Sequence, residues 1–282
     1  MRTRKQTFEC VAMCYHATME DEPSEVALSG GNVNTVVKAG NTVRRKMSPQ
    51  SPNIHALLLH LEAKNVASPR FLGIDEEDRE ILLFIEGATD FPKNLWDNED
   101  HVVASAKLLR DLHDASLDFI PPEPGNWAYA YPDKCQHEVI NHNDFAPYNM
   151  VFGVDGATAI IDFDLSGPGP RCRDLAYLAY WMTPLSFGVG DLQKRSEAQL
   201  RNGCPRLSLL CATYGFDDLE QVLAMVSDVL HHMSDEGVAT SMIGEEAAER
   251  LKLGGHFKHW SNEAFAFDEK LPALVSELSA RR

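Results

Sequence analysis

The hydrophobic pattern of this chain changes at Glu86-Gly87, and the change limits the folds open to it. From Glu25 up to this point, short apolar runs alternate with polar turns, which is typical of an antiparallel meander. Beyond it, long segments carry apolar residues at helical spacing. The sequence therefore predicts an α+β fold, with a small antiparallel β lobe over 23–87 and a larger, mainly helical lobe over 88–282. Residues 1–22 have no clean periodicity and are predicted to be an N-terminal extension.

The same patterns predict individual elements. Two lobes joined at a hinge enclose a cleft, which is the usual place for a ligand. The expected strands are 25–28, 33–39, 42–45, 70–74 and 80–85, and the expected helices are 54–64, 97–118, 172–183, 217–234 and 244–253.

Composition excludes several classes of function. Lys and Arg number 26 against 42 Asp and Glu, a formal charge of -16 that disfavours binding to nucleic acid phosphates. No apolar run approaches the roughly 20 residues that cross a bilayer. The six cysteines are scattered and form no CxxC pair, so we expect reduced thiols, no structural metal and a cytoplasmic location.

A predicted hairpin carries the strongest candidate for chemistry. Runs 150–154 and 157–161 are apolar and are joined by Asp155-Gly156, a strong two-residue turn signal. This turn would set Asn149 directly across from Asp162, and facing Cβ atoms lie about 4.5–5.5 Å apart. An amide oxygen and a carboxylate at that distance can hold one hard cation such as Mg²⁺, with water and phosphates completing its shell.

Asp144 lies in the loop that enters this hairpin, five residues before Asn149. There its carboxylate can orient an attacking hydroxyl and accept its proton without being a metal ligand. Each residue alone also has an ordinary structural explanation: Asp144 as a loop cap, Asn149 as a turn former, Asp162 as an acid at a strand end. Their combination in register favours a functional site.

The pattern His142-x-Asp144-x-x-x-x-Asn149, followed by Ile161-Asp162-Phe163, resembles the catalytic loop and metal motif of the aminoglycoside phosphotransferase and choline kinase group, relatives of protein kinases. Pro147-x-Asn149 and the later Asp174-Leu175-Ala176 also resemble that group. The stretch 139–177, including Pro168-Gly169-Pro170-Arg171, is similar to bacterial phosphotransferase enzyme family proteins, some of them related to a trifolitoxin immunity protein.

The resemblance implies a protein-kinase-like two-lobe fold and a role for each matched residue. Asp144 would be the catalytic base, His142 would brace its loop, Asn149 and Asp162 would be the metal ligands, and Asp174 would anchor the catalytic loop from its helix. Lobe 23–87 would bind the nucleotide, ATP or GTP with Mg²⁺, and lobe 88–282 would carry the catalytic loop and substrate-binding helices.

The N-terminal lobe matches with departures. Ser29, Gly30 and Gly31 form a turn whose backbone N–H groups would cover phosphates, and Phe84, Ile85 and Glu86 resemble the hinge strand that reads the nucleobase. By position Arg44 replaces the phosphate-contacting lysine, with Arg45 as the alternative because one step of register exchanges their faces. The lysine's glutamate partner would be His55 or Glu62. Asp164 is left open between supporting the metal and being a solvated acid.

Three functions follow from these residues. The preferred one is a Mg²⁺-dependent kinase that phosphorylates a hydroxyl of a small molecule, with no nucleic acid or membrane partner. Acidic pairs in the helical lobe could attract a cationic amino sugar or amino alcohol, and aromatic residues such as Trp181 and Trp260 could line its pocket. The ordinary explanations, a solvated acidic surface and core aromatics, are favoured because the whole chain is acidic and scattered aromatics usually pack in a core. The alternative is a kinase-like nucleotide-binding protein without useful turnover, acting as an immunity or regulatory factor. A metal-dependent hydrolase is weaker, since nothing supplies a second metal cluster. The sequence does not determine the acceptor or the oligomeric state.

Overall fold

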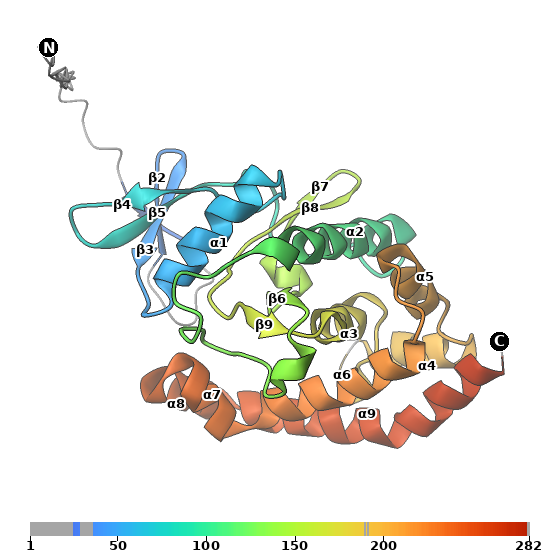
Figure 1. The fold of residues 1–282 in the computed structure, drawn as a ribbon. Coiled ribbons are helices and arrows are strands. Elements are labelled where there is room, and N and C mark those ends of the chain that lie inside the picture. Colours follow the sequence, from blue (N-terminus) through green and yellow to red (C-terminus); the bar gives the residue numbers. More distant parts are fainter. Residues whose placement is uncertain (1–24, 29–35, 189, 191, 281–282) are drawn as a thin grey trace, which may run out of the picture.

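A five-stranded antiparallel sheet forms the N-terminal part of the protein. The computed structural model describes residues 25–28, 36–188, 190 and 192–280. The strand order in the sheet is β1-β2-β3-β5-β4 (Figure 1). The predicted extension 1–22 and the turn at Ser29, Gly30 and Gly31 lie outside the described residues. The strands are β1 (Glu25–Ala27), β2 (Val36–Ala39), β3 (Thr42–Lys46), β4 (Phe71–Ile74) and β5 (Arg79–Leu83).

Helix α1 (Ser51–Ala63) packs on this sheet. Pro52 is tolerated in its first turn because that position needs no backbone N–H partner. Leu57, Leu58 and Leu61 are buried on its inner face. The ring of His55 also faces inward and stacks on Phe71 of β4, with centroids 3.8 Å apart. The helix therefore presents His55 to the sheet.

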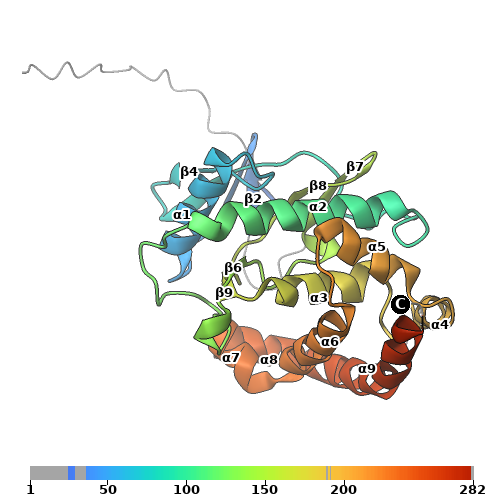
Figure 2. The ribbon, with the colours of Figure 1, turned by 45° about the vertical axis from the view of Figure 1, so that its right-hand side comes forward.

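The rest of the chain is mainly helical. Helix α6 packs against both α3 and α9, while α2 packs against α5 (Figures 1 and 2). Along the described ranges 36–188 and 192–280, no helix is both long and apolar enough to cross a membrane. The helices are α2 (Glu99–Ala115), α3 (Arg171–Met182), α4 (Gln193–Arg201), α5 (Pro205–Tyr214), α6 (Leu219–Ser234), α7 (Glu236–Ile243), α8 (Glu245–Leu253) and α9 (His256–Ser279), with single 3₁₀ turns η1 (Ser116–Asp118), η2 (Lys134–Gln136) and η3 (Pro147–Asn149).

Two small strand pairs hold the loops that carry the candidate site. Strand β6 (Val139–Asn141) pairs with β9 (Gly167–Gly169), and β7 (Met150–Gly153) pairs with β8 (Gly156–Ile160). Gly167 has no room for a side chain, because a Cβ there would lie 1.8 Å from the carbonyl oxygen of Tyr129. The loop between β6 and η3 therefore starts, and the segment after β8 ends, at this closely packed strand pair.

The predicted register of the β7–β8 hairpin is wrong by one residue. Gly153 pairs with Gly156, so the turn is Val154-Asp155, and Thr158 is an extra residue in β8. The hydroxyl of Thr158 donates to the carbonyl oxygen of Val151 at 3.0 Å, which stabilises this bulge. Met150 consequently pairs with Ile160, and Asn149 lies across from Ile161 instead of Asp162.

Candidate active site

Asp174 of α3 anchors the loop that carries Asp144. Its carboxylate accepts the backbone N–H of His142 at 2.6 Å and that of Asn143 at 2.8 Å. The same carboxylate accepts a hydrogen bond from Nε2 of His113 on α2 at 3.1 Å. Nδ1 of His113 in turn accepts from the hydroxyl of Tyr214 at 2.7 Å. The start of the loop is thus tied to three helices: α3, α2 and α5.

Asp174 is fully buried yet remains ionised. Burial alone would raise the pKa of its carboxyl, but the hydrogen bond from His113, the nearby imidazoles of His113 and His142 and the backbone N–H of His142 outweigh burial and lower the pKa. A buried carboxylate with three donors is a strong structural restraint. Its placement agrees with the role that the sequence resemblance implied.

His142 connects this loop to the segment that follows β8. Its side chain is buried, and Nε2 donates to the carbonyl oxygen of Ile161 at 3.0 Å. The imidazole also packs edge-on against Phe145 and Phe163. His142 therefore fixes the backbone directly before Asp162.

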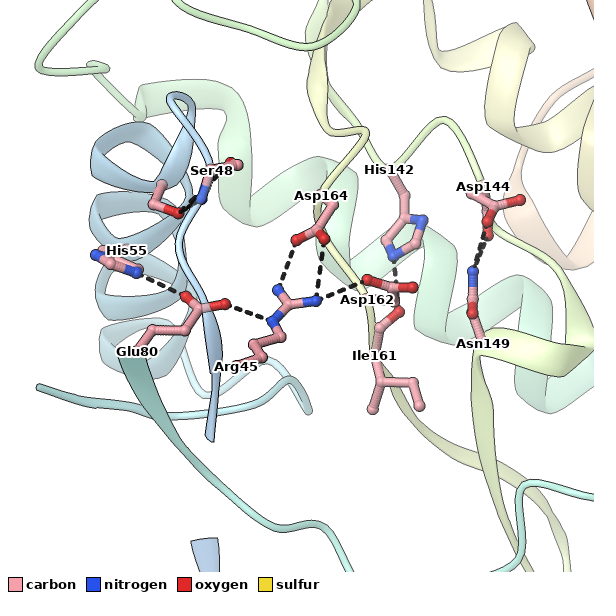
Figure 3. A network of polar contacts seen from close by, with 11 residues as sticks. Arg45, Ser48, His55, Glu80, His142, Asp144, Asn149, Ile161, Asp162 and Asp164 are labelled. Carbon is pink, nitrogen blue, oxygen red and sulfur yellow. Dashed lines mark hydrogen bonds and ion pairs between the residues drawn. The ribbon is translucent and has the colours of Figure 1, made fainter. Parts of the chain in front are cut away.

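Asp144 is held by its two near neighbours in the loop. One carboxylate oxygen accepts from Nδ2 of Asn149 at 2.8 Å (Figure 3). The other accepts from the hydroxyl of Tyr148. That hydroxyl also lies 2.7 Å from the hydroxyl of Tyr177. Burial raises the pKa of Asp144 even though these hydrogen bonds oppose the shift. A half-buried carboxylate with a raised pKa is suited to accept a proton.

Asn149 and Asp162 each have an oxygen atom that a cation could use. Asn149 uses its amide nitrogen on Asp144, so its amide oxygen is the atom that a cation would use. Asp162 has a left-handed backbone with φ of 67°, and its side chain is 48% exposed. Two oxygen ligands fit Mg²⁺, which is commonly held by one or two carboxylates with water and phosphates. Among residues 36–188 and 192–280, no cluster of three or more His, Cys, Asp or Glu side chains could hold a metal by itself.

Arg45 of β3, and not Arg44, extends toward these acids. Its Nη1 donates to Asp162 at 3.0 Å and to Asp164 at 3.1 Å, and its Nη2 donates to Asp164 at 2.5 Å (Figure 3). Arg44 lies on the other face of the sheet, where its guanidinium is 3.8 Å from Glu25 and 3.9 Å from Asp75. The preference for Arg44 was wrong because successive strand residues point to opposite faces.

Glu80 of β5 is a site residue that the sequence analysis missed. It is the cross-strand partner of Arg45 and is 2% exposed. One carboxylate oxygen accepts from Nε of Arg45, and the other accepts from Nε2 of His55 at 2.6 Å. Burial raises the pKa of Glu80, but the His55 hydrogen bond and the Arg45 charge lower it further than burial raises it. The one signal for Glu80 was the pairing of the expected strands 42–45 and 80–85, which sets Glu80 across from Arg45.

The other candidate for the partner position, Glu62, lies at the surface and pairs with Arg70 at 3.3 Å.

Asp164 is bound to Arg45 instead of being free in solvent. Burial, with the charges of Asp162 and Glu80, raises the pKa of Asp164 to about 6, against the opposing effect of Arg45. Asp164 therefore belongs to the same charged cluster as Asp162.

The expected hinge residues follow directly after β5. The backbone N–H of Phe84 donates to the carbonyl oxygen of Asn41 at 2.8 Å, and the ammonium of Lys38 lies 3.5 Å from the centre of the Phe84 ring. Ile85 and Glu86 continue from there, and Ala88 then bridges to Phe152 of β7. This segment carries the chain from the sheet to the helical lobe, and its contact with a nucleobase stays a prediction.

Comparison with known proteins gives the family. Residues 126–207 match the model of the phosphotransferase enzyme family. The trifolitoxin immunity protein of Rhizobium leguminosarum bv. trifolii is 37% identical over 197 residues, which cover 68% of this chain and 74% of that protein.

Two solved structures show the same fold. An ethanolamine kinase of Plasmodium vivax superposes with a TM-score of 0.57 at 14% identity, covering 90% of this chain and 83% of its own. The ADP-bound aminoglycoside phosphotransferase APH(2'')-Ib gives 0.54 at 14% identity, covering 88% and 95%. The predicted two-lobe, protein-kinase-like fold is therefore confirmed. The chain belongs to the same family as the trifolitoxin immunity protein, and its residues 126–207 match the phosphotransferase enzyme family model.

Proposed function

We propose that this protein is a Mg²⁺-dependent kinase that transfers the γ-phosphate of ATP or GTP to a hydroxyl group of a small molecule. The observation that carries the proposal is that three groups lie side by side: the Asp144 carboxylate, the oxygen atoms of Asn149 and Asp162, and the Arg45 guanidinium from the other lobe (Figure 3). Asn149 and Asp162 are brought together because the backbone N–H of Ile161 donates to the carbonyl oxygen of Asn149 at 2.8 Å. These are the base, the metal ligands and the phosphate-binding cation that phosphoryl transfer requires.

Each group has one task. Asp144 orients the acceptor hydroxyl and accepts its proton, and the bond from Asn149 keeps its carboxylate in place. Asn149 and Asp162 would hold Mg²⁺, which neutralises and orients phosphate oxygens. Arg45 already pairs with carboxylate oxygens of Asp162 and Asp164, so its guanidinium can pair with phosphate oxygens in the same way.

The acceptor would enter beside Asp144. Tyr148 and Tyr177, whose hydroxyls lead to Asp144, both pack against the ring of Trp181, and Trp181 packs against Trp260. Aromatic faces next to a carboxylate suit a cationic amino sugar or amino alcohol. The names of the structural relatives, an aminoglycoside phosphotransferase and an ethanolamine kinase, agree with such an acceptor.

A second candidate function is nucleotide binding without useful turnover, in an immunity or regulatory role. The relative named for immunity to trifolitoxin supports it. Arginine at the position of the phosphate-contacting lysine also supports it, since the two side chains differ in geometry. The distinction between the two candidates rests on whether phosphate is transferred.

A titration of thermal stability tests the proposal. ATP and GTP are added with and without Mg²⁺ to the wild type, to Asp162→Ala, to Asp144→Asn and to Asp155→Ala, an exposed acid at the hairpin turn that serves as the control. A ligand at one hundred times its Kd stabilises the folded state by about 2.7 kcal/mol. We expect Mg²⁺-dependent stabilisation in the wild type, in the control and in Asp144→Asn, and its loss in Asp162→Ala.

ADP or GDP release with a panel of amino sugars and amino alcohols then separates the two functions. Release that depends on an acceptor and is abolished in Asp144→Asn supports the kinase. Binding without release for any acceptor supports the second candidate. If no nucleotide stabilises the wild type, both are refuted.

A further inference from the structure

The guanidinium of Arg45 makes hydrogen bonds on two sides: toward the acids of the helical lobe, called the front here, and toward Glu80 of its own sheet, called the rear. Its front nitrogens, Nη1 and Nη2, face Asp162 and Asp164, while its rear nitrogen, Nε, donates to Glu80 (Figure 3). An arginine can divide its donors in this way because its five N–H groups lie in one plane. A lysine would have to share a single ammonium between Glu80 and the phosphates.

Glu80 is fixed more firmly than the two acids in front. Its side chain is 3% exposed, whereas those of Asp162 and Asp164 are 48% and 35% exposed. Both of its carboxylate oxygens are used, one by Arg45 and the other by His55. Because β3 and β5 are paired at these two residues, the sheet itself sets the distance between Arg45 and Glu80.

His55 connects this pair to helix α1. Its ring is 8% exposed and lies nearly parallel to Phe71 at an interplanar angle of 13°, which fixes the direction in which Nε2 donates. The donated hydrogen bond holds one oxygen of the Glu80 carboxylate, while the other oxygen accepts from Arg45. In protein kinases the helix supplies the carboxylate that pairs with the strand lysine. Here a strand supplies the carboxylate, and the helix supplies a hydrogen-bond donor to it.

We infer that Glu80 and His55 are positioning residues, which hold Arg45 by its rear nitrogen so that both front nitrogens face the phosphates of a bound nucleotide. This inference rests on the proposed nucleotide site. It goes beyond that site because it gives two further residues a defined role that acts only through Arg45.

Isothermal titration calorimetry on the full chain tests this dependence with two probes. The first probe is a non-hydrolysable ATP or GTP analogue with Mg²⁺, using whichever nucleotide the wild type binds more tightly. The second is the corresponding nucleoside, which has no phosphates. We expect Glu80→Gln to weaken binding of the first probe about tenfold or more, the scale on which misplaced site groups act. Binding of the nucleoside stays within twofold of the wild type.

Two variants of His55 refine the test. His55→Phe keeps a ring to stack on Phe71 but removes the donor, so it lowers nucleotide affinity. His55→Gln keeps an N–H donor and restores part of the loss. Glu25→Gln is the control, because Glu25 is also a strand glutamate paired with arginine, but on the opposite face of the sheet. It leaves both affinities unchanged.

A double-mutant cycle decides whether Glu80 acts through Arg45. In the Arg45→Gln background, adding Glu80→Gln causes no further loss of nucleotide affinity if the inference is right. An equal loss in both backgrounds, or a parallel loss of nucleoside binding, overturns it. Should Glu80→Gln fail to fold, the same cycle with His55→Phe gives the answer.

The two levels of failure are distinguishable. A wild type that binds no Mg²⁺-nucleotide refutes the proposed function and this inference with it. A wild type that binds normally, with Glu80→Gln and His55→Phe unchanged, refutes the inference alone.

Discussion

Replacing Asp174 by Asn should destabilise the whole protein, because it removes a buried charge on which three donors converge. The donors are the backbone N–H groups of His142 and Asn143 and the imidazole of His113. Asn has nearly the same size, but it replaces one of the two oxygens with an NH₂ group. Whichever way the amide turns, its NH₂ meets an N–H donor instead of an acceptor.

The expected cost follows from the burial of this cluster. Asp174 and His113 are both 0% exposed, so water cannot replace the lost bonds. An NH₂ group turned toward a buried N–H donor leaves both groups without an acceptor, at about 1–3 kcal/mol each, so the total cost is about 2–6 kcal/mol. For a chain of this size, that lowers Tm by about 10 °C. The control is Asp114→Asn, whose ion pairs with Arg110 and Arg171 are partly exposed and contribute about 0–1 kcal/mol.

Urea unfolding followed by circular dichroism at pH 7 measures both variants. The measurement is repeated at lower pH, because the lowered pKa of Asp174 gives the effect a definite sign. A carboxyl with a lowered folded pKa stabilises fully above its unfolded pKa, and this contribution is lost as the pH falls through the folded value. The difference between wild type and Asp174→Asn should therefore be constant at neutral pH and shrink below about pH 4. A loss below 1 kcal/mol at pH 7, equal to that of the control, would refute the reasoning.

Two further predictions concern packing and pH. Gly167→Ala should destabilise the protein by about 2–4 kcal/mol, because its Cβ would collide with the backbone of Tyr129. Gly125→Ala is the control: no atom lies within 4 Å of its Cβ, so the free energy of unfolding should change by less than about 0.5 kcal/mol. Equal unfolding midpoints of the two variants would contradict this prediction. His232 should titrate near pH 4, since burial and the charge of Arg173 lower its pKa to about 4. Between pH 6.5 and 4 the imidazole of His232 is protonated in the unfolded state but not in the folded state, so the protein becomes less stable as the pH falls through that window. A titration midpoint of the His232 imidazole near pH 6.5, measured by NMR, would contradict this prediction.

Much of the fold was predictable because apolar residues repeat with the period of each element. The expected helix at 97–118 is α2 followed by the 3₁₀ turn η1, and the expected helix at 217–234 is nearly identical to α6. Helix α9 was not among the expected helices; Pro272 lies inside it, although a proline usually ends a helical pattern. In this helix, packing against α6 outweighs the local signal.

The candidate site was predictable to the extent that it is local in sequence. Asp144, Asn149 and Asp162 lie within one stretch around a hairpin, so their spacing could be interpreted without knowing the fold. Glu80 could not be found in that way, because its partners Arg45 and His55 are 35 and 25 positions away and only the sheet brings them together. The choice between Arg44 and Arg45 failed for a related reason, since a strand's register decides which face each residue takes.

The unequal burial of the acids around Arg45 indicates which contacts change when a phosphate arrives. The side chains of Asp162 and Asp164 are 48% and 35% exposed, so water can solvate them when Arg45 exchanges them for phosphate oxygens. Glu80 is buried, and leaving it unpaired would cost about 3–5 kcal/mol. Arg45 should therefore release the two acids of the helical lobe and keep Glu80. That exchange would free Asp162 for a cation at the same moment as it places the guanidinium on the phosphates.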